Sequence, residues 1–255
     1  MEWTDEGILL SVRKHGEGSA IVEILTENHG RHAGVVRGGG SKKAAATLQP
    51  GSQFAVNWRA RLEDHLGTFS VELKKSRVTS IMSGRLEIAA FGSISALLLC
   101  CLPERDSQNG MYHLTLNLFD TFRITENWLK MYVHWEMDLL QQTGFGLDLT
   151  DCAVTGVTKG LCYVSPKSGR AVSREGAKGW EDRLLPLPRF LLGSSSDVSP
   201  SDIQQGLKLT GYFLNNRIMT ALGKPELPHS RHRFMRQISL KFNDKPKSTV
   251  ESDGQ

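Results

Sequence analysis

Residues 5–26 of the chain read DEGILLSVRKHGEGSAIVEILT and contain two apolar segments around a glycine-rich break. Ile8, Leu10 and Val12 occupy every second position of the first segment, and residues 20–26 repeat the alternation. A period of two is typical of a strand with one buried and one exposed face, and glycines supply turn conformations between such strands. The stretch therefore predicts a β-hairpin.

The same alternation continues outward from the hairpin along the first 80 residues. Segments 54–59 and 69–74 alternate in the same way, and residues 33–37 add a further short run. Turn-forming pairs at Pro50-Gly51 and Leu66-Gly67 separate these segments. Five short strands in about 75 residues suit a small barrel, either of the oligonucleotide-binding type or of the SH3-like type.

A helical period begins after Thr79. Apolar residues recur at helical spacing in four segments, which are 86–100, 114–122, 128–140 and 203–221. Residues between about 151 and 180 lack this period and are rich in Gly, Ser, Thr and basic residues, so we interpret them as an insertion in a helical bundle. The expected fold class is α+β. The expected parts are a barrel (1–80), a helical domain (81–150 and 184–242), an insertion (151–183) and a polar tail (243–255).

Composition excludes several classes of protein. The net charge of +4 over 255 residues permits a nucleic-acid partner without requiring one. Four cysteines make no disulfide framework and indicate a reducing compartment. The first ten residues carry three acids and no basic residue, unlike a secretory signal, and the apolar stretch 88–102 is too short and too polar to span a bilayer. We expect a cytoplasmic protein without a membrane partner.

The most informative charged stretch is residues 28–43. It contains Arg31, Arg37, Lys42 and Lys43 and no acid, with three consecutive glycines in its middle. Glycines let a backbone approach a ligand closely, and Lys or Arg neutralises phosphate. The glycines are not followed by Lys-Ser or Lys-Thr at P-loop spacing. The stretch is therefore a phosphate-binding loop beside a nucleic-acid site or a flexible solvated loop.

Two further basic regions, residues 59–61 with the neighbouring segment 74–77 and residues 224–247, could bind phosphate or could be ordinary solvent-exposed surface. Arg59 and Arg61 follow Trp58, which shares its alternating set with buried-type residues, so we expect Trp58 in the core and both arginines facing outward. Segment 74–77 adds three basic residues, and pairing of the two strands would place them beside these arginines. Residues 224–247 contain seven basic and two acidic residues and fit either a solvated helix or a surface for phosphate or an acidic peptide.

No residue pattern indicates catalysis or a bound cofactor. The adjacent Cys100 and Cys101 lie in an apolar helical segment and are expected to be buried structural thiols. Cys152 and Cys162 have no second cysteine two or three residues away; Thr155 and Ser165 or Gly169 stand where partners would be, so we expect no zinc. Nucleophile elbows, paired metal-binding histidines and acidic clusters are absent from the sequence. We predict a protein that is not an enzyme.

Several segments together resemble the bacterial RecO family of recombination and DNA repair proteins. They are residues 5–17, 26–39, 48–51, 146–156, 164–173 and 184–188, for example GLDL at 146–149 and VSPKSGRAVS at 164–173. No single segment is diagnostic, but the ordered set covers about residues 1–236 and is fairly specific.

The resemblance implies an N-terminal oligonucleotide-binding barrel, a helical domain and a zinc-finger-like insertion. It also implies binding of single- and double-stranded DNA, annealing of complementary strands, and binding of the acidic C-terminal tail of single-strand-binding protein (SSB). Family members act with RecR to help load RecA on coated strands, which implies a nucleoid-associated cytoplasmic location. The sequence departs from the family at the zinc ligands, because many members use four cysteines and only Cys152 keeps such a place here.

These observations give a list of expected site residues. The expected DNA contacts are Arg13, Lys14, Arg31, Arg37, Lys42, Lys43, Arg59 and Arg61. The expected partner contacts are Arg123, Lys130, Arg231 and Arg233, on segments that also hold Trp128 and Tyr132. Two alternatives stay open: an RNA-binding accessory protein with the same barrel, and a nucleic-acid-modifying enzyme that uses the barrel to hold its substrate.

Overall fold

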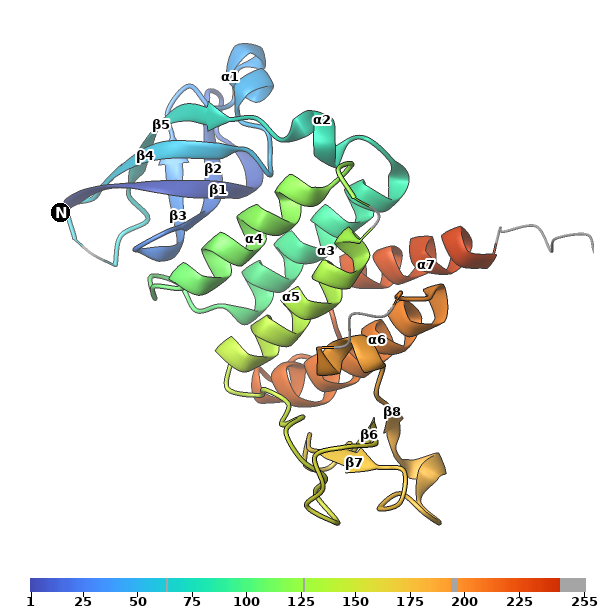
Figure 1. Cartoon of the computed structure of the whole chain (residues 1–255). Coiled ribbons are helices and arrows are strands. Elements are labelled where there is room, and N and C mark those ends of the chain that lie inside the picture. Colours follow the sequence, from blue (N-terminus) through green and yellow to red (C-terminus); the bar gives the residue numbers. More distant parts are fainter. Residues whose placement is uncertain (63, 126, 194–196, 244–255) are drawn as a thin grey trace, which may run out of the picture.

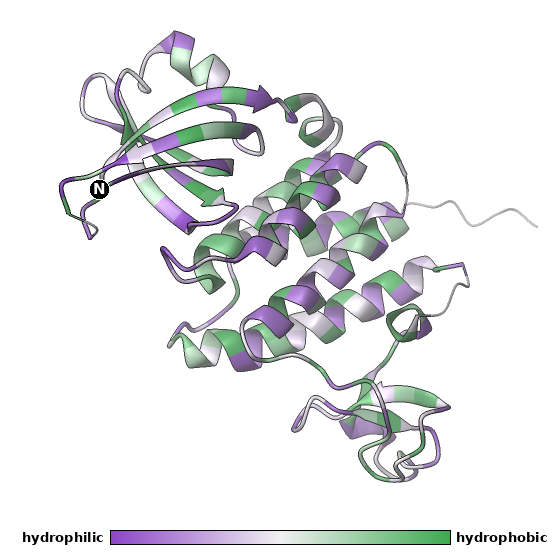
Figure 2. Ribbon diagram, turned by 60° about the vertical axis from the view of Figure 1, so that its left-hand side comes forward, coloured by the Kyte–Doolittle hydropathy of each residue, from purple (hydrophilic) through white to green (hydrophobic). Residues whose placement is uncertain are grey.

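A computed structural model describes residues 1–62, 64–125, 127–193 and 197–243. The N-terminal part is a closed barrel with the strand order β1-β2-β3-β5-β4. Its elements, in chain order, are β1 (Glu2–His15), β2 (Ser19–Thr26), β3 (Gly30–Val36), α1 (Lys42–Thr47), β4 (Gln53–Arg59) and β5 (Thr68–Lys75). The segment between β3 and β4, expected as a loop, therefore contains a short helix. Bands of hydrophilic and hydrophobic residues alternate along the strands (Figure 2).

Strand β1 is buried on both of its faces over residues 8–10. Leu9 belongs to the interior of the barrel, together with Ile24, Phe54 and Trp58. Ile8 and Leu10 belong instead to the core of the helical part. The prediction that this strand has one buried and one exposed face is therefore wrong at residues 8–10, because Leu9 faces the barrel interior and the helices cover Ile8 and Leu10 on the outside. Trp58 is 1% exposed, which confirms its predicted place in the core.

The helical part follows the barrel directly. Its elements are α2 (Val78–Ile81), α3 (Arg85–Cys101), α4 (Asn109–Thr121), α5 (Trp128–Gln142), α6 (Pro200–Phe213), the π-helical segment η3 (Leu214–Met219) and α7 (His229–Asn243). Helix α6 begins at a capping box, in which the Ser199 side chain accepts from the backbone of Asp202 and the Asp202 carboxylate accepts from Ser199. Leucine and aromatic side chains from these helices form one continuous core.

A buried ion pair joins three of these helices. On α7, Arg231 Nε donates to Glu136 Oε1 of α5 at 2.7 Å, and its NH2 group donates to the Leu207 carbonyl oxygen of α6 at 2.8 Å. The Glu136 side chain is fully buried. Gly211 lies against this guanidinium, since a Cβ there would be 2.7 Å from one of its nitrogens. The arginine therefore fixes α7 against α5 and α6.

A small three-stranded sheet projects from the helices between α5 and α6. Its strands have the order β7-β6-β8 and are β6 (Leu161–Val164), β7 (Ala171–Ser173) and β8 (Leu185–Pro186), followed by the short helix η2 (Arg189–Leu192). A further short helix, η1 (Glu181–Arg183), precedes β8. The barrel and this sheet lie at opposite ends of the molecule, with the helices between them (Figure 1).

The barrel is fastened to the helices by charged contacts and by a close backbone approach. Arg77 donates to Asp120 of α4 at 2.7 Å. Gly30 has a φ of +68°, and a Cβ there would be 1.9 Å from the Asp106 carbonyl oxygen. Only glycine fits this position, because the left-handed backbone and the close contact both exclude a side chain.

In the part of the chain that the structure describes, no helix is long and apolar enough to cross a membrane. The polar tail expected at residues 243–255 lies, from residue 244 on, outside the described residues.

Candidate nucleic-acid interface

A cavity of about 700 Å³ opens on the barrel at the junction of β3 and β5. We call it the barrel groove. It is lined by Glu2, Val36, Arg37, Asn57, Arg59, Thr68, Phe69, Ser70 and Val71. Arg37 and Arg59, which are 22 positions apart in the sequence, thus lie on one surface. The hydroxyl and amide groups around them add hydrogen-bonding partners for a polar ligand.

The groove arises from the way in which the barrel closes. Strands β3 and β5 are parallel and pair at a single position, Val35 with Thr68. The residues that follow this pair are Val36 and Arg37 at the end of β3 and in the turn after it, and Phe69 to Val71 on β5; they line the cavity instead of continuing a ladder. The outward-facing positions of β4 supply Asn57 and Arg59.

The glycine-rich turn after Arg37 packs against the protein itself. The Gly40 N–H donates to the carbonyl oxygen of Gly18, in the β1–β2 turn, at 3.3 Å. A Cβ at Gly40 would be 3.0 Å from the Ser19 carbonyl oxygen, and one at Gly39 would be 2.9 Å from that of Val36. Close approach does require these two glycines, but the backbone they approach belongs to this chain. The contact brings the β1–β2 turn beside the turn that carries Arg37.

Lys42 and Lys43 begin helix α1 directly after this turn. The Ser41 hydroxyl caps the helix by accepting from the Ala44 N–H at 3.1 Å. The two lysine side chains are exposed, as are those of Arg13 and Lys14 at the end of β1. The cap and the glycine contact therefore hold these four cations around one end of the barrel without burying them.

Seven of the eight expected DNA contacts are exposed, which leaves them free to meet phosphate. They are Arg13, Lys14, Arg37, Lys42, Lys43, Arg59 and Arg61. One carboxylate pairs with a member of this group: Glu2 lines the barrel groove, and its Oε2 lies 3.9 Å from Arg59 Nε. Exposed pairs of this length contribute little to stability, and a phosphate can displace the carboxylate from the guanidinium.

Arg31 is an exception among the expected DNA contacts. Its NH1 group donates to Glu23 at 3.0 Å and to Glu104 at 3.2 Å, and its side chain is only 11% exposed. Its Nε donates to the Leu102 carbonyl oxygen, at the end of α3. The prediction that Arg31 contacts DNA is therefore not supported: the side chain connects the barrel to the helices and its charge is compensated.

The basic segment 74–77 is also neutralised by neighbouring acids. Lys74 pairs with Glu6, and Lys75 lies 2.9 Å from the Asp120 carboxylate. Arg77 is 4% exposed and pairs with the same carboxylate. Burial alone would raise the pKa of Asp120, but hydrogen bonds from Arg77 and Lys75 lower it. This segment joins the barrel to α4 and adds no free charge next to Arg59.

An aromatic cluster that the sequence did not reveal lies under the groove. The Trp3 ring stacks on His29 with centroids 4.1 Å apart and contacts Phe69, which lines the groove. His32 is buried in the cluster and donates from Nδ1 to the His29 carbonyl oxygen at 2.9 Å. Burial lowers the pKa of His32 to about 4, so the ring is neutral near pH 7. The cluster stabilises one wall of the groove.

A second cavity lies between the helices and is close to one expected partner contact. We call it the helical groove; it has a volume of about 270 Å³. It is lined by Asn127, Leu129, Lys130, Val198, Pro200, Ile203, Lys241 and Phe242. Its lining includes Lys130 and Lys241 and no carboxylate. Such a surface suits an acidic peptide with an apolar side chain.

The other expected partner contacts do not line this groove. Arg231 is buried and paired with Glu136, so the prediction that it binds a partner is wrong. Arg123 and Arg233 are exposed but are not part of the lining. Trp128 and Tyr132, expected beside the groove, are 4% and 0% exposed and belong to the core. Charge alone did not reveal that one arginine in the basic stretch closes an internal ion pair.

The insertion has one cysteine in a place typical of a metal ligand. The thiol sulfur of Cys152 accepts from the N–H groups of Val154, Thr155 and Ser173 at 3.2 to 3.4 Å. Thr155 and Ser173 are 3.3 Å apart through their hydroxyls, and a Cβ at Gly176 would be 3.0 Å from the sulfur. Burial alone would raise the pKa of Cys152, but hydrogen bonds from Ser173 and Thr155 lower it to about 6.

These residues do not fit a zinc ion. The spacings from 152 to 155 and from 173 to 176 are those of paired ligands, but three of the four positions hold Thr, Ser and Gly. Among the described residues there is no group of three or more His, Cys, Asp or Glu side chains that could bind a metal. The sulfur of Cys152 lies beside Thr155, which the sequence indicated, and beside Ser173 and Gly176, which it did not.

Comparison with known proteins agrees with this architecture. The model of the family "Recombination protein O N terminal" matches residues 1–77, and that of "Recombination protein O C terminal" matches residues 83–226. The chain is 50% identical over 239 residues to the DNA repair protein RecO of Cereibacter sphaeroides, covering 94% of this chain and 99% of that protein. It is 50% identical over 242 residues to DNA repair protein RecO of Roseobacter denitrificans, covering 95% of this chain and 100% of that protein.

A third relative, the DNA repair protein RecO of Jannaschia sp., is 48% identical over 235 residues, covering 92% of this chain and 95% of that protein. The family descriptions and these names are those of recombination and DNA repair proteins. Near-complete coverage by both family models and by these relatives confirms the predicted resemblance, and the chain therefore belongs to the RecO family of DNA repair proteins.

Proposed function

We propose that this protein is a DNA-binding mediator of repair and recombination that holds single- and double-stranded DNA along the barrel groove. The observation that carries the proposal is that Arg37 and Arg59 line one groove, while Lys42 and Lys43 are exposed on the helix that follows Arg37. The strand order β1-β2-β3-β5-β4 supports an oligonucleotide-binding type of barrel. We keep the predicted division into barrel (1–80), helical domain (81–150 and 184–242) and insertion (151–183) as part of the proposal.

Strand annealing would follow from the chemistry of this surface. Two complementary strands repel each other through their phosphates, and Lys and Arg side chains that neutralise the phosphates lower this repulsion. The described groove lining contains one aromatic residue, Phe69, which is 4% exposed and therefore unavailable for stacking. The contacts would therefore be made to the sugar-phosphate backbone of the DNA and would leave the bases free to pair. Binding would depend little on the DNA sequence.

An annealing assay tests this function. Two complementary oligonucleotides, one with a fluorophore and one with a quencher, are mixed with wild-type protein or with the variant Arg37→Ala/Arg59→Ala. We expect wild-type protein to accelerate quenching and the variant to lose most of the acceleration. The matched control, Arg85→Ala/Lys208→Ala, removes two exposed charges from α3 and α6 and should anneal like wild type. Equal annealing by both variants would refute the role of the groove.

The same oligonucleotides in RNA form separate the proposal from the RNA-binding alternative. RNA and single-stranded DNA of equal length compete for the protein in one titration. We expect DNA to compete at least as well as RNA, since contacts restricted to phosphate do not recognise a 2′-hydroxyl. A strong preference for RNA would favour the accessory-protein alternative. Nuclease and ATPase assays with divalent metal test the enzyme alternative, for which we expect no turnover.

We further propose that the helical groove binds the acidic C-terminal tail of SSB. The groove combines Leu129, Ile203 and Phe242 with the ammonium groups of Lys130 and Lys241. A labelled tail peptide should bind with at least about tenfold lower affinity to Lys130→Glu/Lys241→Glu, because each lost charge-assisted contact is worth about 1.5–3 kcal/mol. Arg123→Glu/Arg233→Glu is the charge-matched control. A tail that binds equally to both variants would contradict this assignment.

Cooperation with RecR in loading RecA on SSB-coated DNA completes the proposal and rests on family membership. A protein that acts on chromosomal strands works in the cytoplasm at the nucleoid, and we include that location in the proposal. A loading assay with purified RecR, SSB and RecA, read as ATP hydrolysis by RecA, tests it. We expect the annealing-deficient variant Arg37→Ala/Arg59→Ala to slow loading.

A further inference from the structure

A small cavity lies where three helical segments end. We call it the helix-end pocket; its volume is about 270 Å³. Its wall contains the last residue of each helical segment and the residue that follows it. These residues are Cys101 and Leu102 of α3, Gln142 and Thr143 of α5, and Ala221 and Leu222 at the end of the helical turn that continues η3.

The helix ends give this pocket a negative potential. The last carbonyl groups of a helix have no partner within it, so a helix C-terminus carries partial negative charge and favours cations. Helices α3 and α5 are 17 and 15 residues long, and neither has a basic residue in its last turn. Their ends are therefore not compensated by cations of the same helix.

Two polar side chains in the loop after α3 add to this potential. The Asp106 carboxylate is exposed and accepts from Gln108 Nε2 at 2.9 Å. Gln108 is 6% exposed and lines the pocket, and no donor of the described residues reaches its Oε1. Nε2 has to face the carboxylate because Oε1 cannot donate, which leaves Oε1 as the free acceptor. A buried acceptor without a donor is costly, so a ligand that donates to it is favoured.

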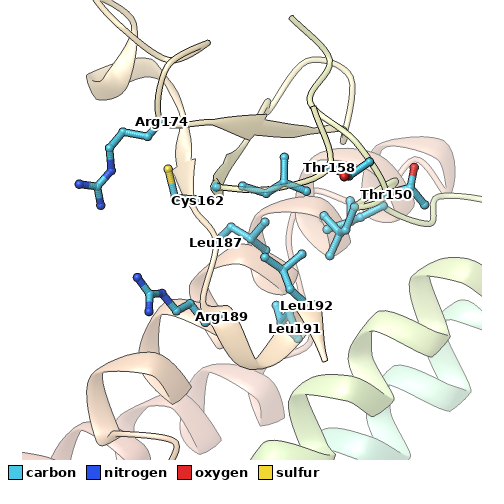
Figure 3. Close-up of a pocket in the computed structure, with 12 residues that line it drawn as sticks. Thr150, Thr158, Cys162, Arg174, Leu187, Arg189, Leu191 and Leu192 are labelled. Carbon is cyan, nitrogen blue, oxygen red and sulfur yellow. The ribbon is translucent and has the colours of Figure 1, made fainter. Parts of the chain in front are cut away.

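The remainder of the wall is mainly apolar and carries no positive charge. Leu102, Phe145 and Ile218 line it, and no Lys, Arg or His of the described residues does. The larger cavity of about 1080 Å³ between the small sheet and η2 has the opposite sign: Figure 3 shows the guanidinium groups of Arg174 and Arg189 extending on one side of it. The helix-end pocket therefore selects a ligand of positive charge.

We propose that the helix-end pocket binds an aliphatic amine in its protonated form. The ammonium group would donate to the Asp106 carboxylate and to Gln108 Oε1, and the methylene chain would lie against Leu102 and Phe145. An ammonium group has three donors and no acceptor, which matches a site made of carboxylate, amide and helix-end oxygens. A metal ion would leave the apolar wall unused and would find one carboxylate.

The protein itself places an ammonium group at one of these helix ends. Lys224 Nζ lies 3.5 Å from the carbonyl oxygen of Cys100, in the last turn of α3, and 3.1 Å from the Cys100 thiol. Cys100 is partly exposed, so the expectation that both adjacent thiols are buried is wrong for Cys100 and confirmed for Cys101. Lys224 does not line the pocket, and the ends of α5 and of the segment after η3 are left for a ligand.

An occupant of the pocket would contact the loop that joins the helices to the barrel. The Arg105 N–H donates to the Arg31 carbonyl oxygen of β3 at 2.9 Å, and Gly30 lies against the backbone of Asp106. A bound amine should therefore stabilise this joint and slow hydrogen exchange of the Arg105 amide. The inference does not rest on the proposed function, because amine binding is measured without DNA.

Hexylamine is the probe, and hexanol and hexanoate are the neutral and negative compounds of equal chain length. Calorimetry and ligand-observed NMR with the full-length protein near neutral pH measure binding. We expect hexylamine to bind at millimolar concentration or below, hexanol to bind at least about tenfold more weakly, and hexanoate not to bind. Exchange of the Arg105 amide, measured by mass spectrometry, should slow with hexylamine alone.

Variants locate the site within the pocket. Asp106→Asn removes the charge and keeps an acceptor for Gln108 Nε2, and Gln108→Met removes the free acceptor at similar volume. Each should weaken hexylamine binding by at least about tenfold. The matched control, Asp182→Asn, removes an exposed carboxylate of the insertion that does not line the pocket, and should bind like wild type.

A lysine derivative distinguishes the two sources of an aliphatic ammonium group. Nα-acetyl-lysine methylamide represents a lysine side chain of another protein, and hexylamine represents a free amine. Both compounds should depend on Asp106. Tighter binding of the lysine derivative would assign the pocket to a protein lysine, and tighter binding of hexylamine would assign it to a free amine.

Three results would overturn the proposal. Hexanol could bind as tightly as hexylamine, which would make the pocket a simple apolar cavity. The Asp106→Asn and Gln108→Met variants could bind hexylamine like wild type. Calcium or magnesium ions could displace hexylamine completely at equal concentration, which would make the pocket a metal site. Circular dichroism and the midpoint of urea unfolding show that the variants are folded, so that loss of binding is not caused by unfolding.

Discussion

The salt dependence of DNA binding gives the sharpest quantitative prediction. Arg37, Lys42 and Lys43 are exposed, and no carboxylate in the described parts of the chain pairs with them. Each is therefore available to neutralise one phosphate and release one counterion. For single strands, the slope of log K against log salt changes by about 0.7 per phosphate contact. Replacing all three by alanine should flatten the slope by about 2.

This change has a measurable consequence over an ordinary salt range. Between about 50 and 200 mM salt, a difference of 2 in slope corresponds to about a fifteenfold difference in the loss of affinity. Fluorescence anisotropy with labelled oligo(dT) at five or more salt concentrations determines the slope. The variant should bind more weakly than wild type at low salt, and the two curves should converge as salt rises.

The control variant removes the same charge from elsewhere. Arg85, Lys178 and Lys208 are exposed on α3, on the insertion and on α6, and replacing them by alanine changes the net charge equally. Its slope should stay at the wild-type value. An unchanged slope in the Arg37/Lys42/Lys43 variant, or an equal flattening in the control, would refute the reasoning that these three side chains contact phosphate.

Three further predictions concern stability and metal binding. Burial lowers the pKa of His32 to about 4, so the folded state favours the neutral ring; the free energy of unfolding should be greatest above about pH 6.5 and fall by up to about 3 kcal/mol as the pH drops to about 4. Urea unfolding across this pH range should show a flatter profile in the variant His32→Gln. An equally steep profile in that variant would contradict the assignment. The variant Arg231→Met should destabilise the protein by about 3–5 kcal/mol, because it leaves Glu136 buried and unpaired. The double variant Arg231→Met/Glu136→Leu should recover much of that loss in the same urea unfolding assay. A loss below about 1 kcal/mol in the single variant would show that the ion pair is unimportant for stability. Cysteines placed at Thr155, Ser173 and Gly176, which are spaced like metal ligands around Cys152, should create a cobalt-binding site with thiolate absorption. Elemental analysis of the wild-type protein should find no stoichiometric zinc. Zinc in the wild type would contradict the conclusion that these residues do not fit the ion.

Much of the barrel could be predicted from the sequence because its signals are local. Alternation and glycine turns depend on neighbouring residues, so the strands around Val56 and Phe69 were identified from a short window. The prediction of one exposed face on β1 failed at residues 8–10, because Leu9 faces the barrel interior and Ile8 and Leu10 are covered by helices that begin some 70 residues later. A local hydrophobic period does not indicate how one part of the chain packs on another.

The candidate site was harder to predict because charges have no period. Arg37 and Arg59 share a groove only because β3 pairs with β5 next to them, which is a property of the topology. Arg31 and Arg231 resemble the other cations in the sequence, but each meets a carboxylate that is distant along the chain. A sequence shows where positive charge is, and the fold decides which charges are left free.

Covalent footprinting of arginine and lysine side chains tests the central claim most directly. Protein alone and protein saturated with single-stranded DNA are treated with arginine- and lysine-specific reagents, and modification at each residue is measured by mass spectrometry. Our account predicts strong protection of Arg37, Arg59 and Lys42, with no change at the exposed Lys178 and Lys208. Protection that is equal across all five, or that spares Arg37 and Arg59, would contradict it.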